Sequence, residues 1–410
     1  MTYSYVSHLY CPKCERTYSS EEKNQLCECG APLLVAYKMN ELKEAFKPES
    51  LVEREPNLWR YHELLPVEDP QNVVTLGEGM TPMLRMNRVG EHMGIPNLFM
   101  KDEGLIPSGS FKSRGAAVGV SKAKEVGIEE LAMPTNGNAG AAWSLYCARA
   151  NITSTIVMPI DAPAITRKEC VAAGADLYLV NGLIGDAGKI VGQAVKDYNL
   201  FDASTLKEPY RIEGKKTMGL EIAEQFEWEV PDVILYPTGG GVGLIGIYKA
   251  LRELQELGWI AEEKMPRLVA VQSEGCAPIV KAWEEGKTSA DPWENASTVA
   301  FGINVAKALG DFLILDGIRK TNGCAISVSD DAILEELKFV ATNEGSFVCP
   351  EGAAAFAAAR KLREQDWIKS NERVVVLNTG AGIKYPNTIE VDAPILQKDE
   401  KIVRDPTIKL

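Results

Sequence analysis

The sequence predicts an α/β protein in which mostly parallel sheets are flanked by helices. Apolar runs typical of strands alternate along most of the chain with segments of helical periodicity. Strands separated by helices of about ten or more residues need crossover connections, so the sheets should be mostly parallel. The strand–helix units are too many for one compact sheet, and we expect two. The strands are expected at residues 97–101, 130–134, 153–159, 176–180, 232–236, 267–272, 325–328 and 373–378, and helices at 141–150, 165–173, 186–198, 244–257, 330–344 and 352–364.

Composition and charge narrow the possible partners. The 410 residues carry a formal net charge of −13, so duplex DNA and anionic membranes should repel the surface. The first residues lack the basic start and apolar stretch of a signal peptide, and no apolar run approaches the ~20 residues that span a bilayer. Nine cysteines spread over a long chain do not form a disulfide framework. We therefore expect a cytoplasmic protein that binds a small molecule, no nucleic acid and no membrane.

The first 36 residues differ in composition from the rest of the chain. Two residues separate Cys11 from Cys14, and one residue separates Cys27 from Cys29. Four thiolates form a closed tetrahedral site for a structural zinc ion, so the segment is typical of a small zinc ribbon. The alternative is a ribbon that keeps its shape without a metal. A connector rich in charge and proline follows, with a short helix expected at residues 40–46.

A Ser- and Gly-rich segment, residues 107–115, precedes a helix-like stretch rich in Ala and Val. Lys112 at the start of this helix would feel the positive potential of Arg114 and of the helix dipole, which favours the neutral, nucleophilic amine. A lysine that forms a Schiff base needs that form. The alternative, which holds for most lysines, is a solvated surface side chain.

Two strand–turn–helix junctions are rich in small residues. They are residues 135–140 (TNGNAG) and 237–243 (PTGGGVG). Exposed backbone N–H groups at the start of a helix bind carboxylates and phosphates. The second junction also satisfies the dinucleotide fingerprint, residues 241–246, with Glu274 closing the next strand as a candidate ribose ligand. Ordinary turns without a ligand are the alternative for both.

Two further segments contribute polar groups. Thr379 follows the last expected strand, and its hydroxyl would bond a pyridine nitrogen without protonating it. Residues 210–217 (YRIEGKKT) gather three cations in an acidic protein, where an Arg fork suits a phosphate or carboxylate. A solvated charge run is the alternative.

Phosphate-binding-loop, HExxH and GxSxG motifs are absent, and the three histidines lie outside these clusters, which argues against a His-dependent hydrolase.

Taken together and in order, these motifs resemble the fold-type II pyridoxal-phosphate enzymes, and among them the threonine synthase family. Residues 110–112 match the lysine motif that binds the cofactor, and residues 137–138 match the asparagine loop over its ring. Residues 238–243 match the phosphate cup, and residues 379–380 match the contact with the pyridine nitrogen. Three further segments are similar to segments typical of threonine synthases. They are residues 75–82 (TLGEGMTP), residues 209–217 (PYRIEGKKT) and the N-terminal Cys ribbon at residues 1–36.

The resemblance implies conversion of O-phosphohomoserine and water to L-threonine and phosphate by a homodimer with Lys112 as the catalytic residue. It also implies a linker and the start of a large domain at residues 37–112, a small mobile domain at 113–204, and the rest of the large domain at 205–395. The residues implied to bind pyridoxal 5'-phosphate are Lys112, Asn138, Gly239, Gly240, Gly241, Val242, Gly243 and Thr379. Those implied to bind the amino-acid phosphate are Thr135, Asn136, Ala139, Ser204, Arg211, Lys216 and Thr217.

Three positions depart from the family pattern. Ser113 stands where threonine synthases usually carry Asp, Ala139 replaces a Thr or Ser, and Ser204 lies in a segment without the usual Asn. These changes leave open a threonine or serine ammonia-lyase, or a β-replacement synthase acting on O-phosphoserine. A nicotinamide dehydrogenase built on residues 241–246 and a non-catalytic amino-acid sensor are the alternatives from other classes.

Overall fold

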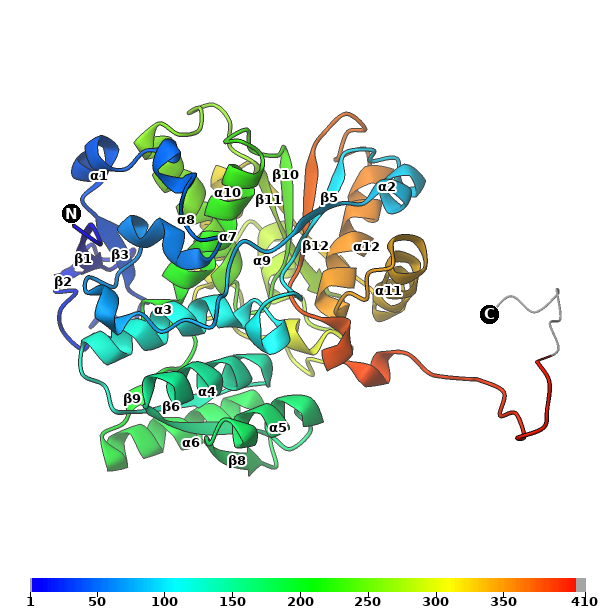
Figure 1. Cartoon of the computed structure of the whole chain (residues 1–410), viewed down its shortest axis with the longest axis horizontal. Helices are drawn as coiled ribbons and strands as arrows, with labels where there is room; N and C mark the ends of the chain where they lie inside the picture. Colours follow the sequence, from blue (N-terminus) through cyan, green and yellow to red (C-terminus); the bar gives the residue numbers. More distant parts are fainter. Residues whose placement is uncertain (1, 403–410) are drawn as a thin grey trace.

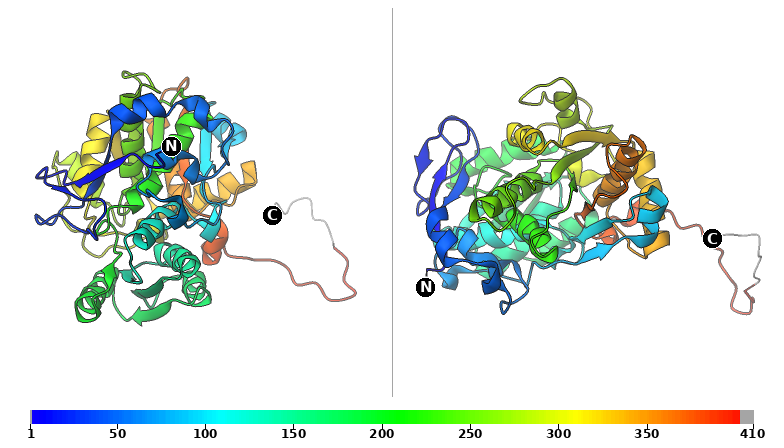
Figure 2. Two further views of the ribbon diagram at one scale, coloured as in Figure 1. Left: turned by 60° about the vertical axis from the view of Figure 1, so that its left-hand side comes forward. Right: turned by 90° about the horizontal axis from the view of Figure 1, so that it is seen from above.

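The computed structural model describes residues 2–402, which form three sheets (Figures 1 and 2). The largest has six strands in the order β12-β11-β10-β13-β5-β4. Its first five strands pair in parallel, and β4 lies antiparallel to β5 at one edge. The strands are β4 Met83–Arg85, β5 Leu98–Asp102, β10 Val233–Pro237, β11 Arg267–Ser273, β12 Cys324–Val328 and β13 Val374–Asn378. The expected mostly parallel architecture is confirmed, with β4 as an unforeseen antiparallel edge.

Alternate side chains of the large sheet belong to two separate hydrophobic cores, as strand geometry requires. Ile234 and Val375 belong to the core shared with α7, α8, α9 and α10, whereas Val233 and Val374 belong to the core shared with α2, α11 and α12. Because helices cover both faces, β10 and β13 are almost continuous apolar runs. The helices are α2 Asn87–Met93, α7 Arg211–Gln225, α8 Val242–Leu257, α9 Pro278–Glu284, α10 Asp311–Lys320, α11 Asp330–Glu344 and α12 Pro350–Glu364.

The second sheet is entirely parallel, in the order β8-β7-β6-β9. Its strands are β6 Glu130–Pro134, β7 Thr153–Pro159, β8 Asp176–Val180 and β9 Phe201–Asp202, and its helices are α4 Asn138–Ala150, α5 Ala164–Ala172 and α6 Ile184–Tyr198. Figure 1 shows this unit below the large-sheet unit, with α3 Lys112–Glu125 between them. Helix α3 packs against both α4 and α7. Lys112 therefore lies at the junction of the two units.

The N-terminal segment is an antiparallel sheet in the order β2-β1-β3 (Figure 2). Its strands are β1 Val6–Tyr10, β2 Thr17–Tyr18 and β3 Leu34–Tyr37. Leu9 and Val35 belong to the same hydrophobic core as α7 and α8, so the segment is docked on the large unit. Helix α1 Met39–Ala45 follows, close to the helix expected at residues 40–46.

Helix α7 is the main departure from the sequence-based expectation. Residues 210–217 are expected from the sequence to bind a phosphate or carboxylate, with a solvated charge run as the alternative and no helix predicted, but nearly all of them lie in the first turns of a buried helix. Their charges are buried because they are paired: Glu213 Oε2 lies 2.6 Å from Lys216 Nζ, and Glu221 further along α7 lies 2.5 Å from Arg114. Apolar periodicity cannot reveal a helix whose buried face carries charges.

The helices and the cysteines of residues 2–402 have two further properties. None of the helices in this range combines the length and apolar character needed to cross a bilayer. All nine cysteines are free thiols. Beyond the last short 3-10 turn, Pro386–Thr388, the chain runs away from the body as an extended segment (Figure 1).

Candidate active site

A cavity of about 370 Å³ lies where the two α/β units meet, beyond the carboxyl ends of β6, β10 and β13. Ligands of α/β proteins bind at this edge of a parallel sheet, because the loops and helix N-termini after the strands converge there. Most of the predicted residues line it: Lys112, Thr135, Asn136, Asn138, Ala139, Ser204, Arg211, Gly239, Gly240, Gly241, Val242 and Thr379. Gly243, Lys216 and Thr217 do not.

Lys112 is the first residue of α3 and lies on the cavity wall. Burial and the Arg211 guanidinium lower the pKa of its amine to about 8, against the opposing effects of Glu351 and Cys349. Its Nζ lies 4.1 Å from the centroid of the Phe111 ring. A nucleophilic amine is therefore available close to neutral pH.

Arg114 does not supply the positive potential that the sequence analysis attributes to it. Its guanidinium is fully buried, with Nε 2.6 Å from Glu103 and Nη1 2.5 Å from Glu221. Arg114 thus ties α3 to α7 and to the residue after β5. The cation that acts on Lys112 is Arg211.

The glycine-rich turn after β10 leads into α8, with Gly241 as the N-cap residue at φ 71°. A Cβ on Gly241 would lie 2.1 Å from Ile314 Cδ1, and one on Gly243 would lie 2.0 Å from Tyr236 Oη, so neither position accepts a side chain. The bare backbone and the free N–H groups in the first turn of α8 suit a phosphate. Gly243 supports this turn from behind by packing on Tyr236.

The same glycines do not build a dinucleotide site. Gly246 is required by the packing of α8 on α7, since a Cβ there would lie 2.8 Å from the backbone nitrogen of Lys216. Glu274, the candidate ribose ligand, is exposed, lies 3.9 Å from Lys361 and does not line the cavity. Helix packing and a tight strand-to-helix turn account for the pattern.

Asn138 begins α4 and reaches across the cavity to the large unit. Its Nδ2 donates to Tyr385 Oη at 2.9 Å, and Tyr385 donates to Glu351 Oε1 at 3.0 Å. Asn138 Oδ1 and Glu351 Oε2 are buried without a hydrogen-bond partner, which marks them as groups that a bound molecule can satisfy. Tyr385 and Glu351 are not predicted from the sequence, because an acid in the first turn of a helix and a Tyr after a strand end are ordinary patterns.

Thr379 follows β13 and lies beside the lysine segment. Its carbonyl accepts the Phe111 N–H at 3.0 Å, and its hydroxyl lies 3.7 Å from Cys349 Sγ. The Thr379 hydroxyl suits a ring nitrogen that stays unprotonated, because a hydroxyl, unlike a carboxylate, does not favour protonation of that nitrogen.

Arg211 and Ser204 also line the cavity, at the start of α7 and just after β9. The Arg211 guanidinium pairs with Glu208, donates to Thr205 Oγ1 at 3.1 Å and lies 4.8 Å from the centroid of the Trp143 ring. The Ser204 hydroxyl donates to Asp202. These contacts hold the guanidinium rigidly at the cavity wall.

The second cation of this wall is Lys215, where the sequence analysis selects Lys216. Lys216 Nζ lies 2.6 Å from Glu213 and 2.9 Å from Glu253, away from the cavity. Thr217 accepts a hydrogen bond from Arg114 at 2.9 Å and also faces away. Because successive residues of a helix point in different directions, the two lysines serve different sides of α7.

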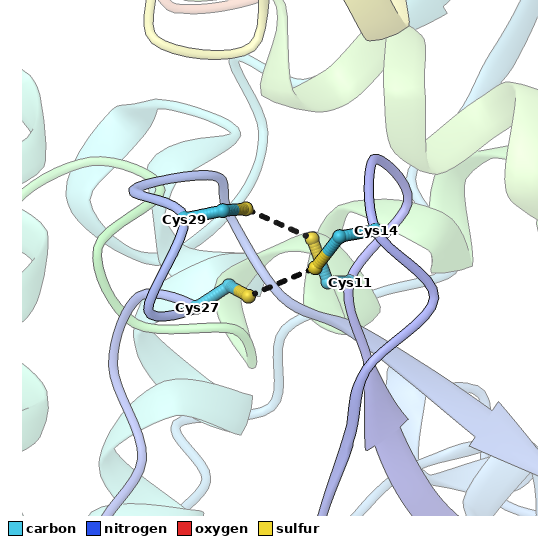
Figure 3. A group of neighbouring side chains, drawn as sticks. All are labelled: Cys11, Cys14, Cys27 and Cys29. Carbon is cyan, nitrogen blue, oxygen red and sulfur yellow. Dashed lines mark hydrogen bonds between the residues drawn. The ribbon is translucent and has the colours of Figure 1, made fainter.

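The four cysteines of the N-terminal segment converge, as Figure 3 shows. All four sulfur atoms lie within 4.8 Å of one another, with Cys11 3.5 Å from Cys29 and Cys14 3.4 Å from Cys27. Zn–S bonds of about 2.3 Å in a tetrahedron place sulfur atoms about 3.8 Å apart. The four thiols and their distances therefore fit a structural metal, although only one residue separates Cys27 from Cys29 in the sequence.

Comparison with known proteins decides the family. The family model described as "Pyridoxal-phosphate dependent enzyme" matches residues 74–380. The threonine synthase of Methanocaldococcus jannaschii is 35% identical over 393 residues, covering 96% of this chain and 95% of that protein. The threonine synthase of Methanosarcina acetivorans is 37% identical over 384 residues, covering 93% of each chain. This chain belongs to the threonine synthase family of pyridoxal-phosphate-dependent enzymes.

Solved structures show the same fold beyond the threonine synthases. Diaminopropionate ammonia lyase from Escherichia coli superposes with a TM-score of 0.65 at 15% identity, over 78% of this chain and 88% of that one. Maize serine racemase gives 0.63 at 22% identity, over 74% and 88%. At these identities the likeness establishes the fold-type II architecture, and the substrate has to be argued from the site.

Proposed function

We propose that this member of the threonine synthase family converts O-phosphohomoserine and water to L-threonine and phosphate. The observation that carries the proposal is the cavity, where a buried amine, Lys112, is joined in the lining by two further basic side chains, Arg211 and Lys215, in a protein of net charge −13. Such a local excess of positive charge suits an amino acid that also carries a phosphate. The names of the relatives at 35% and 37% identity support the same reaction.

Pyridoxal phosphate suits the residues of this cavity. Lys112 would hold its aldehyde carbon, the turn at residues 239–243 its phosphate, Asn138 its ring oxygen and Thr379 its ring nitrogen. The buried, unpartnered Asn138 Oδ1 and the glycine turn that admits no side chain support this assignment. When bound, the cofactor supplies the electron sink that makes the protons at Cα and Cβ acidic.

The chain's own residues then bind the substrate and move its protons. Lys112, with its lowered pKa, would carry protons at Cα and Cβ. Thr135 Oγ1 accepts from the N–H groups of Gly137 and Gly140 at 2.9 and 3.1 Å, so it braces the turn and leaves the N–H groups of Asn138 and Ala139 for the carboxylate. Arg211 would bind the substrate phosphate.

We also propose that the unit at residues 113–204 is a small domain that closes over the cavity, with residues 37–112 and 205–395 forming the linker and the large domain. The separate sheet β8-β7-β6-β9 supports this division, and its Asn138–Tyr385 contact is a bond that closure would tighten. Closure would exclude water until the addition step is due. A smaller radius of gyration in X-ray scattering when a substrate analogue binds is the expected result.

Product analysis tests the reaction against its nearest rivals. The protein loaded with pyridoxal phosphate should release phosphate and threonine from O-phosphohomoserine. An ammonia-lyase would instead release 2-oxobutanoate from threonine, and a β-replacement synthase would act on O-phosphoserine. A higher kcat/KM for either of those substrates would overturn the assignment.

We propose that Cys11, Cys14, Cys27 and Cys29 bind a structural zinc ion. Their convergence to within 4.8 Å supports it. Elemental analysis should find one zinc per chain, and Cys14→Ser should lose it and lower Tm. Cys324→Ser, a cysteine on β12 outside the cluster, is the matched control.

We further propose that the enzyme is a cytoplasmic homodimer. The free thiols of the described residues and the resemblance to dimeric family members support this. Sedimentation of the purified protein at two chains per particle and its recovery in the soluble cell fraction are the expected results.

A further inference from the structure

Lys215 is held at the cavity wall by close helix packing. A Cβ on Gly115 would lie 3.0 Å from Lys215 Cε, and one on Gly246 would lie 3.0 Å from Lys215 Cβ, so two glycines make room for this one side chain. Its amine donates to the Phe111 carbonyl and lies 4.1 Å from the centroid of the Phe111 ring. Lys112 lies at the same distance from that ring. The fold therefore places two amines at one aromatic side chain in the cavity.

Lys215, like Lys112, has no carboxylate partner within residues 2–402, whereas Lys101 and Lys216 do. Lys101 Nζ lies 2.7 Å from Glu221, and Lys216 Nζ lies 2.6 Å from Glu213. The acceptor for Lys215 is a backbone carbonyl. An ammonium that is buried without a counter-ion is costly, so this amine is poised to be neutral until an anion arrives.

The charged groups that face Lys215 strengthen this effect. They are Lys112 and Arg114 on α3, Arg211 on α7 and Glu103 after β5. Burial first and then these cations hold the pKa of the Lys215 amine well below its usual value. Glu103 offers little compensation, because it already accepts two hydrogen bonds from Arg114 at 2.6 and 2.7 Å.

We propose that Lys215 is a second catalytic lysine, which takes up a proton when the substrate phosphate binds beside it and returns that proton to the oxygen that leaves Cγ. The inference rests on the proposed function. As the Cγ–O bond breaks, its electron pair stays on the oxygen, and the proton moves from Lys215 Nζ to that oxygen. Hydrogen phosphate leaves, and the electrons released when Cβ loses its proton form the Cβ–Cγ double bond.

The chemistry requires such a donor, and the neighbouring cations do not provide it. A phosphate ester dianion that left without a proton would depart as the strongly basic trianion. Arg211 can bind the phosphate, but a guanidinium stays protonated in proteins and cannot transfer its proton. Lys112 is occupied with the protons at Cα and Cβ. Lys215 has both the position and the lowered proton affinity that general acid catalysis uses.

Two esters of homoserine test this role in the holoenzyme. The phosphate ester needs a proton at its leaving oxygen, and the sulfate ester does not. Lys215→Gln and Lys215→Arg should each lower kcat on the phosphate ester about 10²- to 10³-fold, but on the sulfate ester less than about tenfold. Lys215→Arg, which keeps the charge, should keep KM for the phosphate ester near that of the wild type. The exposed control Lys189→Gln should change neither rate. Equal losses on both esters, or no loss, would overturn the proposal.

Proton uptake gives a readout that does not depend on turnover. The holoenzyme is titrated near pH 7.5 with an amino acid that carries a phosphonate in place of the phosphate ester, in buffers of different ionisation enthalpy. The wild type should take up about one more proton than Lys215→Arg, and equal uptake would overturn the proposal. A wild type that releases no phosphate from O-phosphohomoserine would instead refute the proposed function, which separates the two failures.

Discussion

Two sides of helix α7 hold buried charges, and they differ in how those charges are balanced. On the core side, Glu221 contacts both Arg114 and Lys101, which lower the pKa of its carboxyl to about 2 although burial alone would raise it. On the cavity side, Lys215 has no carboxylate, and the amine of Lys112 nearby has a pKa of about 8. A buried pair holds geometry, whereas an unpaired buried amine costs stability and persists where a ligand or a reaction uses it. Pairing, more than burial, separates Glu221 from Lys215 on this helix.

The largest effect is expected on the cavity side. Lys112→Ala should lower the rate of phosphate release about 10⁴-fold or more, because it removes both the covalent attachment point and the proton carrier. The far-ultraviolet circular dichroism spectrum should stay unchanged, since Lys112 makes no ion pair within residues 2–402. A variant that keeps a tenth of the activity would contradict the assignment.

Breaking the core side should affect stability instead. Glu221→Gln leaves Arg114 and Lys101 with a buried charge excess, so the free energy of unfolding in urea should fall by about 3–5 kcal/mol. Glu229→Gln is the control, because the Glu229–Lys264 pair is exposed and its loss should cost less than about 1 kcal/mol. Equal effects of the two substitutions would show that the buried Glu221 pairs contribute no more to stability than an exposed pair does.

The unpaired lysine predicts a stability effect of the opposite sign. Lys112→Met should make the cofactor-free protein more stable at pH 7, by up to about 3 kcal/mol, because the folded wild type must bury a protonated amine. Its folded pKa of about 8 lies below the 10.5 of an ordinary lysine. The unfolded chain therefore binds more protons between these values, and wild-type stability rises with pH there. The difference in free energy of unfolding between variant and wild type should therefore shrink from pH 8 to pH 10.5. Urea unfolding at pH 7 and at pH 10 measures it. An equal difference at both pH values would show that burial of the charged amine is not the cause.

The smallest effect concerns the bridge between the two units. Tyr385→Phe removes the acceptor of the Asn138 amide and the donor to Glu351, a loss of about 1 kcal/mol, or roughly fivefold in cofactor affinity. Equilibrium dialysis of pyridoxal phosphate measures it. Tyr178→Phe, on an exposed part of β8, should leave affinity unchanged, and equal affinities for all three proteins would show that the bridge does not hold Asn138 in place.

The predictable parts of this molecule are those with a local signal. Strands β10 and β13 are apolar runs because both sheet faces are covered, and residues 239–243 are recognisable because a tight turn and a following helix demand glycine. Helix α7 is not predicted from the sequence because its buried side is charged, and helix α9 is not predicted because it is too short for a periodic pattern. Tyr385 and Glu351 are not predicted as site residues because neither has an unusual sequence context.

By itself, the sequence predicted many of the strands and helices and singled out Lys112 and the glycine turn at residues 239–243 as candidates to hold a cofactor, because each depends on residues close together in the chain. Only the tertiary structure decided which of the neighbouring lysines 215 and 216 faces the cavity. Successive residues of a helix point about 100° apart, so the packing of α7 against α3 and α8 sends one amine to a pair of carboxylates and the other to the reaction.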